Sequence, residues 1–262
     1  DPYHHLLSNH NCFKEYDFSR EKITHCSMQT RILANIPTLF ARYRKPVSID
    51  ECCYEGDIIH QWGSISAREM TYRFWRCVSQ GAYCTHGETF YSEDEVLWWA
   101  RGGRLKGESP ARIGFCREII ESLGGPIEPV TGGLAGLSNL PVDKQNETLE
   151  NLPEEFRVFT GAFLAMSPAE QKLFSFFEHE YSGHIGEEVY LTFCDIRTCS
   201  RIDMKLPQDQ KYRVELIDVY EMRRETLPSL YSGNDQIPLP GREGIAVIAR
   251  RVKWSNEDVR EK

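Results

Sequence analysis

The segment Lys45-Pro-Val-Ser-Ile-Asp-Glu-Cys-Cys-Tyr-Glu-Gly56 decides how the N-terminal half of this chain folds. The β-branched residues Val47 and Ile49 alternate with polar ones and predict a strand, and Asp50 and Glu51 stand where that strand should end. In a β/α barrel, catalytic groups lie at the carboxyl ends of the strands, where variable loops build the rim. The carboxylates therefore indicate either a site for glycoside chemistry or a strand followed by an acidic, solvated loop.

Strand and helix patterns alternate around this segment over the first 125 residues. The predicted strands are residues 6–12, 23–29, 46–50 and 81–90. The predicted helices are residues 32–43, a helix opened by the capping box Ser66–Glu69, and one opened by Ser109-Pro110. Such alternation predicts a parallel sheet with covering helices. About four such units are present, whereas a closed barrel has eight, so the sheet is either open and doubly wound or half of a barrel.

The second half of the chain has a different pattern. Residues 126–160 are rich in glycine and proline and are predicted to be a linker. In residues 161–255, a helix opened by Ser167–Glu170 precedes strand patterns at 189–193, 212–219 and 245–249. We therefore expect three regions: residues 1–125, the linker, and a small antiparallel β domain at 161–255.

Composition narrows the classes of protein. The 262 residues carry a net charge of −8, which argues against nucleic acid as a partner. No apolar run approaches the roughly 20 residues of a membrane helix, and the first residues lack a signal-peptide pattern. The nine cysteines are odd in number and follow no repeating framework, which favours reduced thiols and a cytoplasmic location.

Glu51 is the leading catalytic candidate. Retaining glycosidases need two carboxyl groups roughly 5–5.5 Å apart, one as nucleophile and one as proton donor. Glu88, in Thr85-His-Gly-Glu-Thr89, ends the next predicted strand and is a candidate for the second carboxyl. Substrate binding or a salt bridge at the rim is the preferred interpretation of Glu88, because neighbouring strand ends do not by themselves set the required separation.

Other side chains at predicted strand ends are suited to binding sugar hydroxyls or sugar rings. His25 and His86 are either hydrogen-bonding groups at the rim or structural histidines. Trp98, in the pair Trp98-Trp99, is a candidate for stacking on a sugar ring, with ordinary burial as the alternative. Asn9, near the end of the first strand, and Tyr54, just after the carboxylates, complete the predicted binding set.

The sequence predicts no metal and no cofactor. His4-His5 and His10 have no carboxylate at a fixed spacing. The histidines of His179-Glu-Tyr-Ser-Gly-His184 lie one residue too far apart for the zinc-protease helix, and Gly102-Gly103 does not follow a strand as a phosphate loop would.

Several motifs, taken in order, resemble the apiosidase-like β/α barrels, which belong with the retaining glycoside hydrolases of the clan A type. The motifs in the first half are Asp1–Leu6, Asn9-His10-Asn11, Ile23–Ser27, Pro46–Gly56, Gly81–Thr89, Trp98-Trp99, Gly102-Gly103 and Gly107–Ser109. The second half is similar to the small β domain that follows such barrels, through Tyr190–Phe193, Leu206-Pro207, Tyr212–Asp218, Glu221-Met222 and Leu239–Gly241.

This resemblance implies strands five to eight of a TIM-type barrel, followed by a small β-sandwich-like domain. Glu51 then matches the nucleophile of the seventh strand, and His25 matches a rim residue of the sixth. The acid/base Glu of such enzymes ends the fourth strand within an Asn-Glu pair, and this sequence has no matching pair ahead of its first motif. We therefore expect a retaining hydrolase of plant-type or other oligosaccharides that pairs with a missing N-terminal barrel half or with a second copy. The alternative is a carbohydrate-binding or interaction protein without catalysis.

Overall fold

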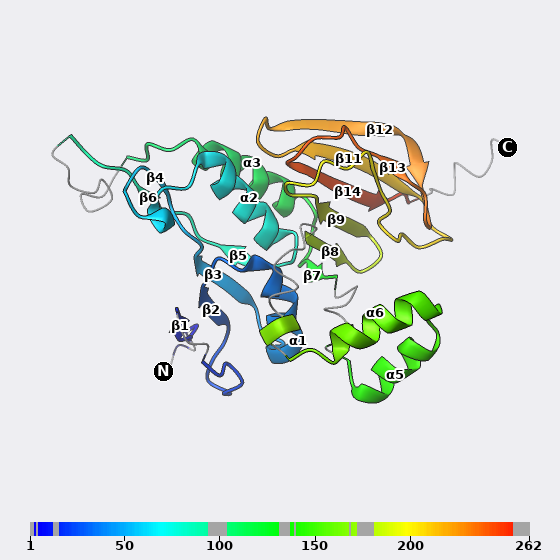
Figure 1. Cartoon of the computed structure of the whole chain (residues 1–262). Helices are drawn as coiled ribbons and strands as arrows, with labels where there is room; N and C mark the ends of the chain where they lie inside the picture. Colours follow the sequence, from blue (N-terminus) through cyan, green and yellow to red (C-terminus); the bar gives the residue numbers. More distant parts are fainter. Residues whose placement is uncertain are drawn as a thin grey trace.

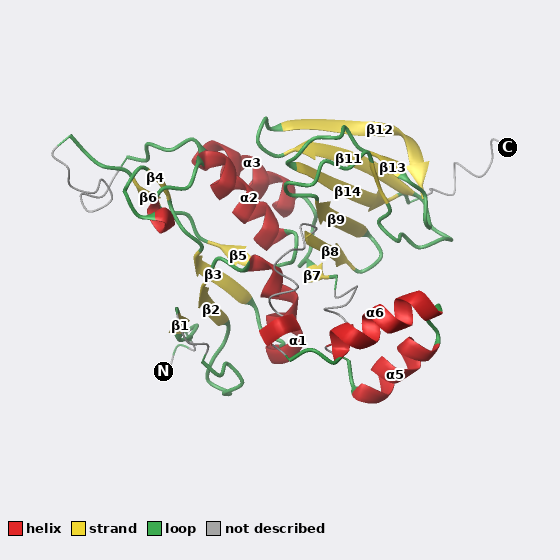
Figure 2. Cartoon of the chain, in the orientation of Figure 1, coloured by secondary structure: helices red, strands yellow, loops and turns green. Residues whose placement is uncertain are grey.

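A four-stranded parallel sheet forms the N-terminal half of the molecule, and a six-stranded antiparallel sheet forms most of the C-terminal half (Figure 1). This computed structural model describes residues 3, 5–12, 16–93, 104–130, 137–138, 140–167, 169–171 and 181–253. Helices lie between the two sheets and beside them (Figure 2). In the described part of the chain, every helix is too short or too polar to cross a membrane. The fold is therefore mixed α/β, with one parallel and one antiparallel sheet.

The parallel sheet has the strand order β1-β2-β3-β5. Its strands are β1 (His10–Asn11), β2 (Cys26–Gln29), β3 (Val47–Glu51) and β5 (Tyr83–Cys84). Helix α1 (Ile36–Tyr43) connects β2 to β3, and α2 (Ala67–Val78) lies between β3 and β5. The predicted alternation of strand and helix around a parallel sheet is confirmed.

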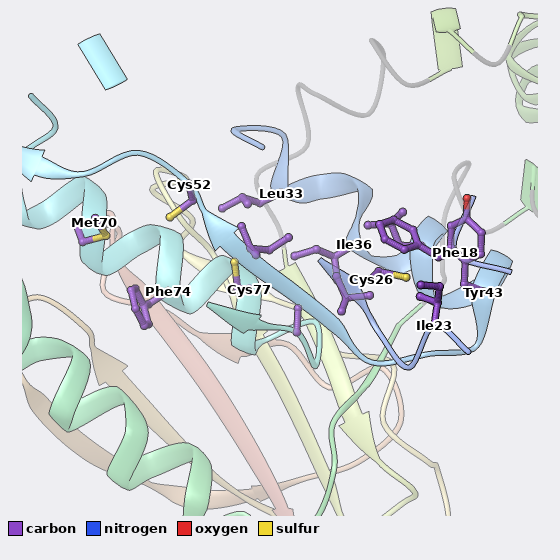
Figure 3. Packing of buried hydrophobic residues seen from close by; sticks show 14 residues of the cluster. Phe18, Ile23, Cys26, Leu33, Ile36, Tyr43, Cys52, Met70, Phe74 and Cys77 are labelled. Carbon is purple, nitrogen blue, oxygen red and sulfur yellow. The ribbon is translucent and has the colours of Figure 1, made fainter. Parts of the chain in front are cut away.

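The two faces of this sheet differ in polarity. On one face, Val47 and Ile49 are fully buried and pack against the apolar sides of α1 and α2, in the cluster that Figure 3 shows. Residues in register across a sheet share a face, and the opposite face carries the aligned row His10, Ser27, Ser48 and Tyr83. The Tyr83 side chain is 68% exposed, so the described residues leave this face uncovered at β5.

The segment predicted as one strand at residues 81–90 forms two short ones. After β5 the chain turns, and β6 (Glu88–Thr89) pairs in parallel with β4 (Glu55–Gly56) beyond the carboxyl ends of the main strands. The 3-10 turn η2 (Gln61–Gly63) follows β4. Glycine is required at position 87, between β5 and β6, because the ring of Tyr54 occupies the space that a side chain there would need.

Two helices begin as their capping residues and prolines predict, and a third begins differently. The hydroxyl of Ser66 accepts the Glu69 N–H at 3.2 Å, so the predicted capping box of α2 is confirmed. Pro37 lies in the first turn of α1, after the 3-10 turn η1 (Leu33–Asn35). Helix α3 (Ser109–Glu121) begins one residue earlier than predicted, and the Ser109 hydroxyl donates to Glu55 instead of capping the helix.

The antiparallel sheet has the order β12-β11-β14-β9-β8-β7. Its strands are β7 (Glu128–Pro129), β8 (Tyr181–Ile185), β9 (Val189–Phe193), β11 (Tyr212–Asp218), β12 (Arg223–Tyr231) and β14 (Ile245–Arg251). A two-stranded ribbon of β10 (Arg201–Ile202) and β13 (Ile237–Pro238) packs against it. The three strands predicted in this region are confirmed, in a single sheet with a ribbon.

One hydrophobic core joins the two halves. Tyr72 and Trp75 of α2 and Ile119 of α3 pack against Leu191 and Phe193 of the antiparallel sheet. The antiparallel sheet is therefore covered by α2 and α3 on one face and by the β10–β13 ribbon on the other. The boundaries at residues 125 and 160 stay a prediction.

The segment predicted as a linker, residues 126–160, contains regular structure. It holds β7 and the helices α5 (Val142–Glu150) and α6 (Glu154–Leu164), which pack together as a hairpin. The sequence pattern predicts Pro141 and Pro153 within a loop, but each stands directly before one of these helices. Proline is compatible with a helix start, because the first N–H groups of a helix have no partner within it.

Candidate active site

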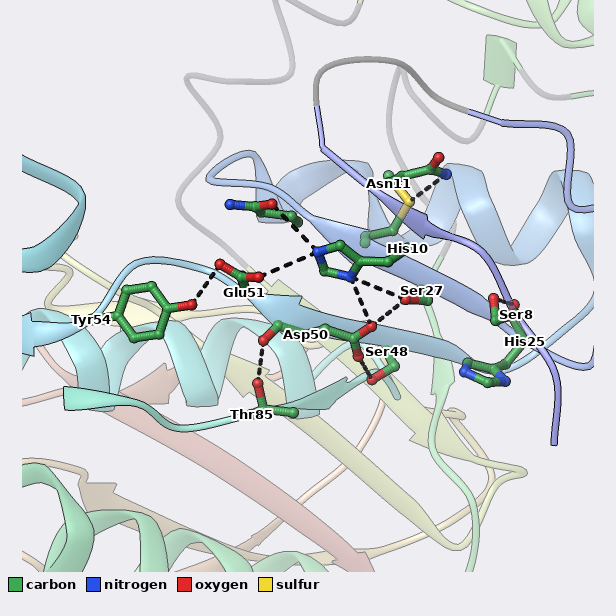
Figure 4. A network of polar contacts seen from close by, with 12 residues as sticks. Ser8, His10, Asn11, His25, Ser27, Ser48, Asp50, Glu51, Tyr54 and Thr85 are labelled. Carbon is green, nitrogen blue, oxygen red and sulfur yellow. Dashed lines mark hydrogen bonds and ion pairs between the residues drawn. The ribbon is translucent and has the colours of Figure 1, made fainter. Parts of the chain in front are cut away.

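Glu51 ends β3 at the carboxyl edge of the parallel sheet, and both of its carboxylate oxygens have a polar partner (Figure 4). The Tyr54 hydroxyl donates to Glu51 Oε2 at 2.5 Å. His10 Nε2 lies 3.3 Å from Glu51 Oε1. The Glu51 side chain is still 33% exposed, so it is fixed in orientation and open to a ligand.

A tight reversal after β3 brings Tyr54 back onto Glu51. Cys53 has a φ of +89°, a conformation that side-chain-bearing residues rarely adopt. The Tyr54 N–H then donates to the Trp62 carbonyl at 2.8 Å, which anchors the residue. Burial and the hydrogen bond to Glu51 both raise the pKa of Tyr54. Tyr54 therefore remains a protonated donor at neutral pH.

A second carboxylate, Asp50, lies beside Glu51 on the same histidine. Asp50 Oδ2 is 3.4 Å from His10 Nδ1, and the Asp50 carboxylate accepts hydrogen bonds from the hydroxyls of Ser27 and Ser48. Burial alone would raise the pKa of Asp50, but the bonds from Ser27, Ser48 and His10 outweigh it and hold the pKa below its usual value. Asp50 is therefore an ionised anchor of the network.

A shift in strand register explains how one histidine reaches two consecutive carboxylates. Met28 pairs with Ile49, but the next residue, Gln29, pairs with Glu51. Successive side chains of a regular strand point to opposite faces. The extra residue at this bulge changes the direction of the side chains and allows Asp50 and Glu51 to contact the same ring.

Glu51 opens onto a cavity of about 850 Å³, a size typical of small-molecule sites. Its lining combines three charged side chains with two aromatic ones. The lining residues are Cys12, Gln29, Thr30, Arg31, Glu51, Cys53, Tyr54, Trp62, Gly87, Glu88 and Thr89.

Glu88, which lines the cavity, and Glu55 form a buried pair of carboxylates. The Glu88 oxygens accept the N–H groups of Lys106 and Gly107 at 2.8 and 2.9 Å. Glu55 accepts the N–H groups of Glu108 and Ser109 at 2.8 and 3.1 Å. The pair thus fastens the segment that leads into α3, and the N-terminal end of that helix favours negative charge.

His86 lies beside this pair. Its Nε2 is 3.2 Å from the Ser109 hydroxyl and 3.9 Å from Glu88 Oε1. Burial lowers the pKa of His86, although the charges of Glu88 and Glu55 oppose this effect, so the ring is neutral near pH 7. One donor atom from each of Glu55, His86 and Glu88 lies within 4.8 Å of the others, close enough for a metal ion. The backbone N–H bonds already account for both carboxylates, so the geometry does not require one.

The structure brings some of the predicted site residues together and separates others. Glu51, Tyr54 and Glu88 all line the cavity, and His86 lies next to Glu88. Asn9 is exposed and directly precedes β1. Trp98 falls outside the described residues.

His25 lies away from the cavity, contrary to its predicted position at the rim. It directly precedes Cys26, the first residue of β2, whereas the strand reaches the rim at Gln29. Its ring contacts Thr24, with 3.0 Å between His25 Nδ1 and Thr24 Oγ1. Its carbonyl accepts the hydroxyl of Ser8, which lies beside it in Figure 4. The strand predicted over residues 23–29 begins only at Cys26, so His25 lies at its amino end and not at the carboxyl end where the prediction places it.

Sequence patterns alone do not identify three residues of the site. His10 has no carboxylate at a fixed spacing in sequence, yet parallel pairing of β1, β2 and β3 brings it to Asp50 and Glu51. Trp62 and Arg31 belong to no motif. Arg31 closely follows the end of β2, and that proximity is the signal that could have identified it. Trp62 lies in η2, away from the end of β3, and carries no such signal.

The fold is similar to that of glycoside hydrolases of known structure. Over 96% of its length the chain matches a candidate glycoside hydrolase from Bacteroides vulgatus ATCC 8482, with a TM-score of 0.69, 24% identity and 46% of that chain covered. A second structure, described as a glycoside hydrolase, has a TM-score of 0.52 and 9% identity over 94% of this chain and 50% of that one. The chain therefore spans about half the length of these two structures.

Sequence comparison adds one family. Residues 178–250 match the model of a domain of unknown function, DUF5605. This region begins just before β8 and ends within β14, so it corresponds to most of the antiparallel sheet. None of the curated proteins matches the chain.

Proposed function

We propose that this chain carries the nucleophile of a retaining glycoside hydrolase, and that Glu51 is that nucleophile. The observation that carries the proposal is the geometry of Glu51. Its carboxylate ends a parallel strand, is oriented by Tyr54 and His10, and opens onto a cavity of about 850 Å³. In the proposed reaction, Glu51 attacks the anomeric carbon while the glycosidic C–O bond breaks and the leaving oxygen takes a proton from the acid/base carboxyl, which gives a glycosyl-enzyme intermediate. The same acid/base then takes a proton from water, and the water cleaves the glycosyl ester and restores the Glu51 carboxylate.

The hydrogen bonds around Glu51 suit this role. Two donors on a carboxylate fix its direction and leave the exposed lone pairs of each oxygen available for attack. Tyr54 contributes a neutral donor, so it orients Glu51 without cancelling its charge. His10 is shared with Asp50, which keeps the ring directed toward both carboxylates.

The proposed reaction also needs a proton donor, and Glu88 is poorly suited to that role. Both Glu88 oxygens accept backbone N–H groups, and the residue is only 6% exposed. These bonds favour a structural role in fastening the cavity wall. We therefore assign the acid/base to a carboxyl group outside the described residues, supplied by a further barrel segment or by a second chain.

The polar, partly uncovered face of the parallel sheet supports this assignment. In a closed barrel, one face of the sheet is covered by helices and the other lines the interior. Here α1 and α2 cover the apolar face, and the opposite face presents His10, Ser27, Ser48 and Tyr83. The four strands thus fit the second half of an apiosidase-like barrel of the clan A type, with plant-type oligosaccharides as its proposed substrates.

A second candidate function is carbohydrate binding without catalysis. One observation favours it: among the described residues that line the cavity, Glu51 and Glu88 are the only carboxylates, and Glu88 is engaged by the backbone. A binder would hold a sugar in the cavity and release no product.

The test compares the chain with its Glu51→Gln variant on a panel of aryl glycosides and plant oligosaccharides. We expect Glu51→Gln to lower kcat by at least about a thousandfold, because the nucleophile is lost while the side-chain shape is kept. Glu225→Gln, an exposed carboxylate on β12, is the matched control and should leave kcat unchanged. Substantial turnover by Glu51→Gln would refute the nucleophile assignment. Sugar binding by both proteins, with turnover by neither even of dinitrophenyl glycosides, whose leaving groups need no proton donor, would favour the binding function.

A further inference from the structure

Of the three charged residues that line the cavity, two have hydrogen-bond or ion-pair partners within the described protein. Glu51 is engaged by Tyr54 and His10, and Glu88 by two backbone N–H groups. Arg31 also lines the cavity; the residue is exposed, and it has no hydrogen-bond or ion-pair partner among the residues that the structure describes. An arginine that faces a concave site without a partner is suited to a carboxylate, which its planar guanidinium binds through two parallel hydrogen bonds.

The backbone on both sides of Arg31 is fixed. The Thr30 N–H donates to the Glu51 carbonyl at 2.9 Å, and the Ile32 N–H donates to the Thr30 hydroxyl at 3.0 Å. Arg31 is therefore tied to the strand end that carries Glu51. A group held by Arg31 would lie close to the proposed reaction centre.

Trp62 supplies a second and different surface of the same cavity. Its side chain is 40% exposed, and it is braced by His60, whose ring is stacked at 5.7 Å and 6°, and by Tyr54, whose ring meets it nearly edge to face at 5.9 Å. The Gly63 N–H also donates to the His60 carbonyl, which closes the turn that presents the indole. A braced, half-exposed indole is suited to stacking on the apolar face of a sugar ring.

From these two surfaces we infer that the cavity binds a uronic acid residue, with the sugar ring against Trp62 and its carboxylate on Arg31. This inference rests on the proposed function for its choice of a sugar. A neutral sugar would form no ion pair with Arg31, and a small inorganic anion would make no use of Trp62. The negative charges of Glu51 and Glu88 repel a carboxylate, so a uronate is accepted only when its charge points toward Arg31. The cavity therefore orients the ring as well as binding it.

The test measures binding by ligand-observed NMR titration on the full chain carrying Glu51→Gln, which removes turnover from the measurement. The probes are methyl glucuronides and methyl galacturonides, compared with the matching neutral methyl glycosides. We expect the uronides to bind at least about tenfold more tightly than the neutral sugars, as a charge-assisted bond provides. Adding Arg31→Gln should remove that preference, whereas Trp62→Ala should weaken both classes by a similar factor. Arg223→Gln, an exposed arginine on β12, is the control and should change neither.

Three results would overturn the inference. They are neutral sugars that bind as tightly as uronides, uronide binding that survives Arg31→Gln, and sugar sulfates that bind as well as uronides. Failure of the hydrolase proposal is recognised separately. If uronides bind in an Arg31-dependent way and the unmodified chain shows no turnover, the uronate subsite is supported and the hydrolase proposal is not. Glu51-dependent hydrolysis restricted to neutral glycosides would support the hydrolase and refute the uronate subsite.

Discussion

At the scale of single residues, Glu51 and Glu55 lie four positions apart but have different surroundings. Glu55 is 4% exposed, and its oxygens accept hydrogen bonds from the start of α3. Glu51 is 33% exposed and faces the cavity. A carboxylate with its oxygens buried against backbone N–H groups stabilises structure, whereas one that is oriented but accessible can react. This difference in exposure makes Glu55 a structural anchor of the site and Glu51 its candidate nucleophile.

The Gly107→Ala substitution tests whether Glu55 anchors the start of α3. A methyl group at position 107 would overlap the carboxylate of Glu55, so Gly107→Ala must displace one of the bonds to Glu108 or Ser109. We expect a loss of about 1–3 kcal/mol in the free energy of unfolding, the cost of a buried charged group with a broken hydrogen bond. Gly114→Ala in α3 is the control, because open space surrounds that position, and it should stabilise by about 0.5–1 kcal/mol. Urea denaturation of both variants measures the difference, and equal effects would contradict the anchoring role.

At the scale of elements, short features at strand ends and helix starts place the site. The bulge between β2 and β3 directs Asp50 and Glu51 to one histidine, and the positive φ of Cys53 returns Tyr54 to Glu51. Helix α2 follows this reversal and covers the apolar face of β3 with Met70 and Phe74. The stability of α2 therefore supports both the core and the site.

The N-cap of α2 gives the prediction at this scale. Ser66→Ala removes the acceptor of the Glu69 N–H and should cost about 1 kcal/mol of folding stability. Ser66→Asp keeps an acceptor and adds a negative charge at the helix N-terminus, so it should retain most of the stability. Thermal unfolding followed by circular dichroism compares the three proteins. If Ser66→Asp were as unstable as Ser66→Ala, the cap would not be the cause.

At the scale of the whole molecule, a buried ion pair links the parallel-sheet half to the antiparallel sheet. Arg76 of α2 donates to Asp195 Oδ1 at 3.0 and 2.7 Å, and it also binds Glu69. Asp195 follows β9 and is 1% exposed. The surrounding core of α2, α3 and β9 is apolar, so these charges depend on one another.

Asp195→Asn tests this link. Asparagine keeps the volume and tolerates the positive φ of 51° at this position, but it removes the charge that faces Arg76. We expect a loss of about 2 kcal/mol in the free energy of unfolding, within the range of hydrogen bonds to charged groups. Glu121→Gln disrupts the exposed pair with Arg117 and should leave the stability nearly unchanged, because solvent screens that pair. Similar small losses in both would mean that the buried pair contributes little to stability.

Much of the secondary structure follows from the sequence because its causes are local. The alternation of Val47 and Ile49 with polar residues indicates β3, the capping box at Ser66 indicates α2, and similar patterns indicate β9, β11 and β14. The position of Glu51 at a strand end follows from the same pattern. Errors arise where local signals are ambiguous: Pro141 and Pro153 start helices, and a strand predicted to begin too early displaces His25.

Local sequence patterns predict the strand that carries Glu51, the helices that cover it and the mixed α/β class, because periodicity and capping act within a few residues. Which side chains meet Glu51 depends instead on packing between distant segments. His10 arrives through parallel strand pairing and Tyr54 through a strained turn, whereas Arg31 and Trp62 line the same cavity as Glu51. These contacts join residues from separate segments, and their geometry depends on strand register and backbone reversal. No local pattern encodes that geometry, because a shift of one residue in register turns a side chain to the opposite face.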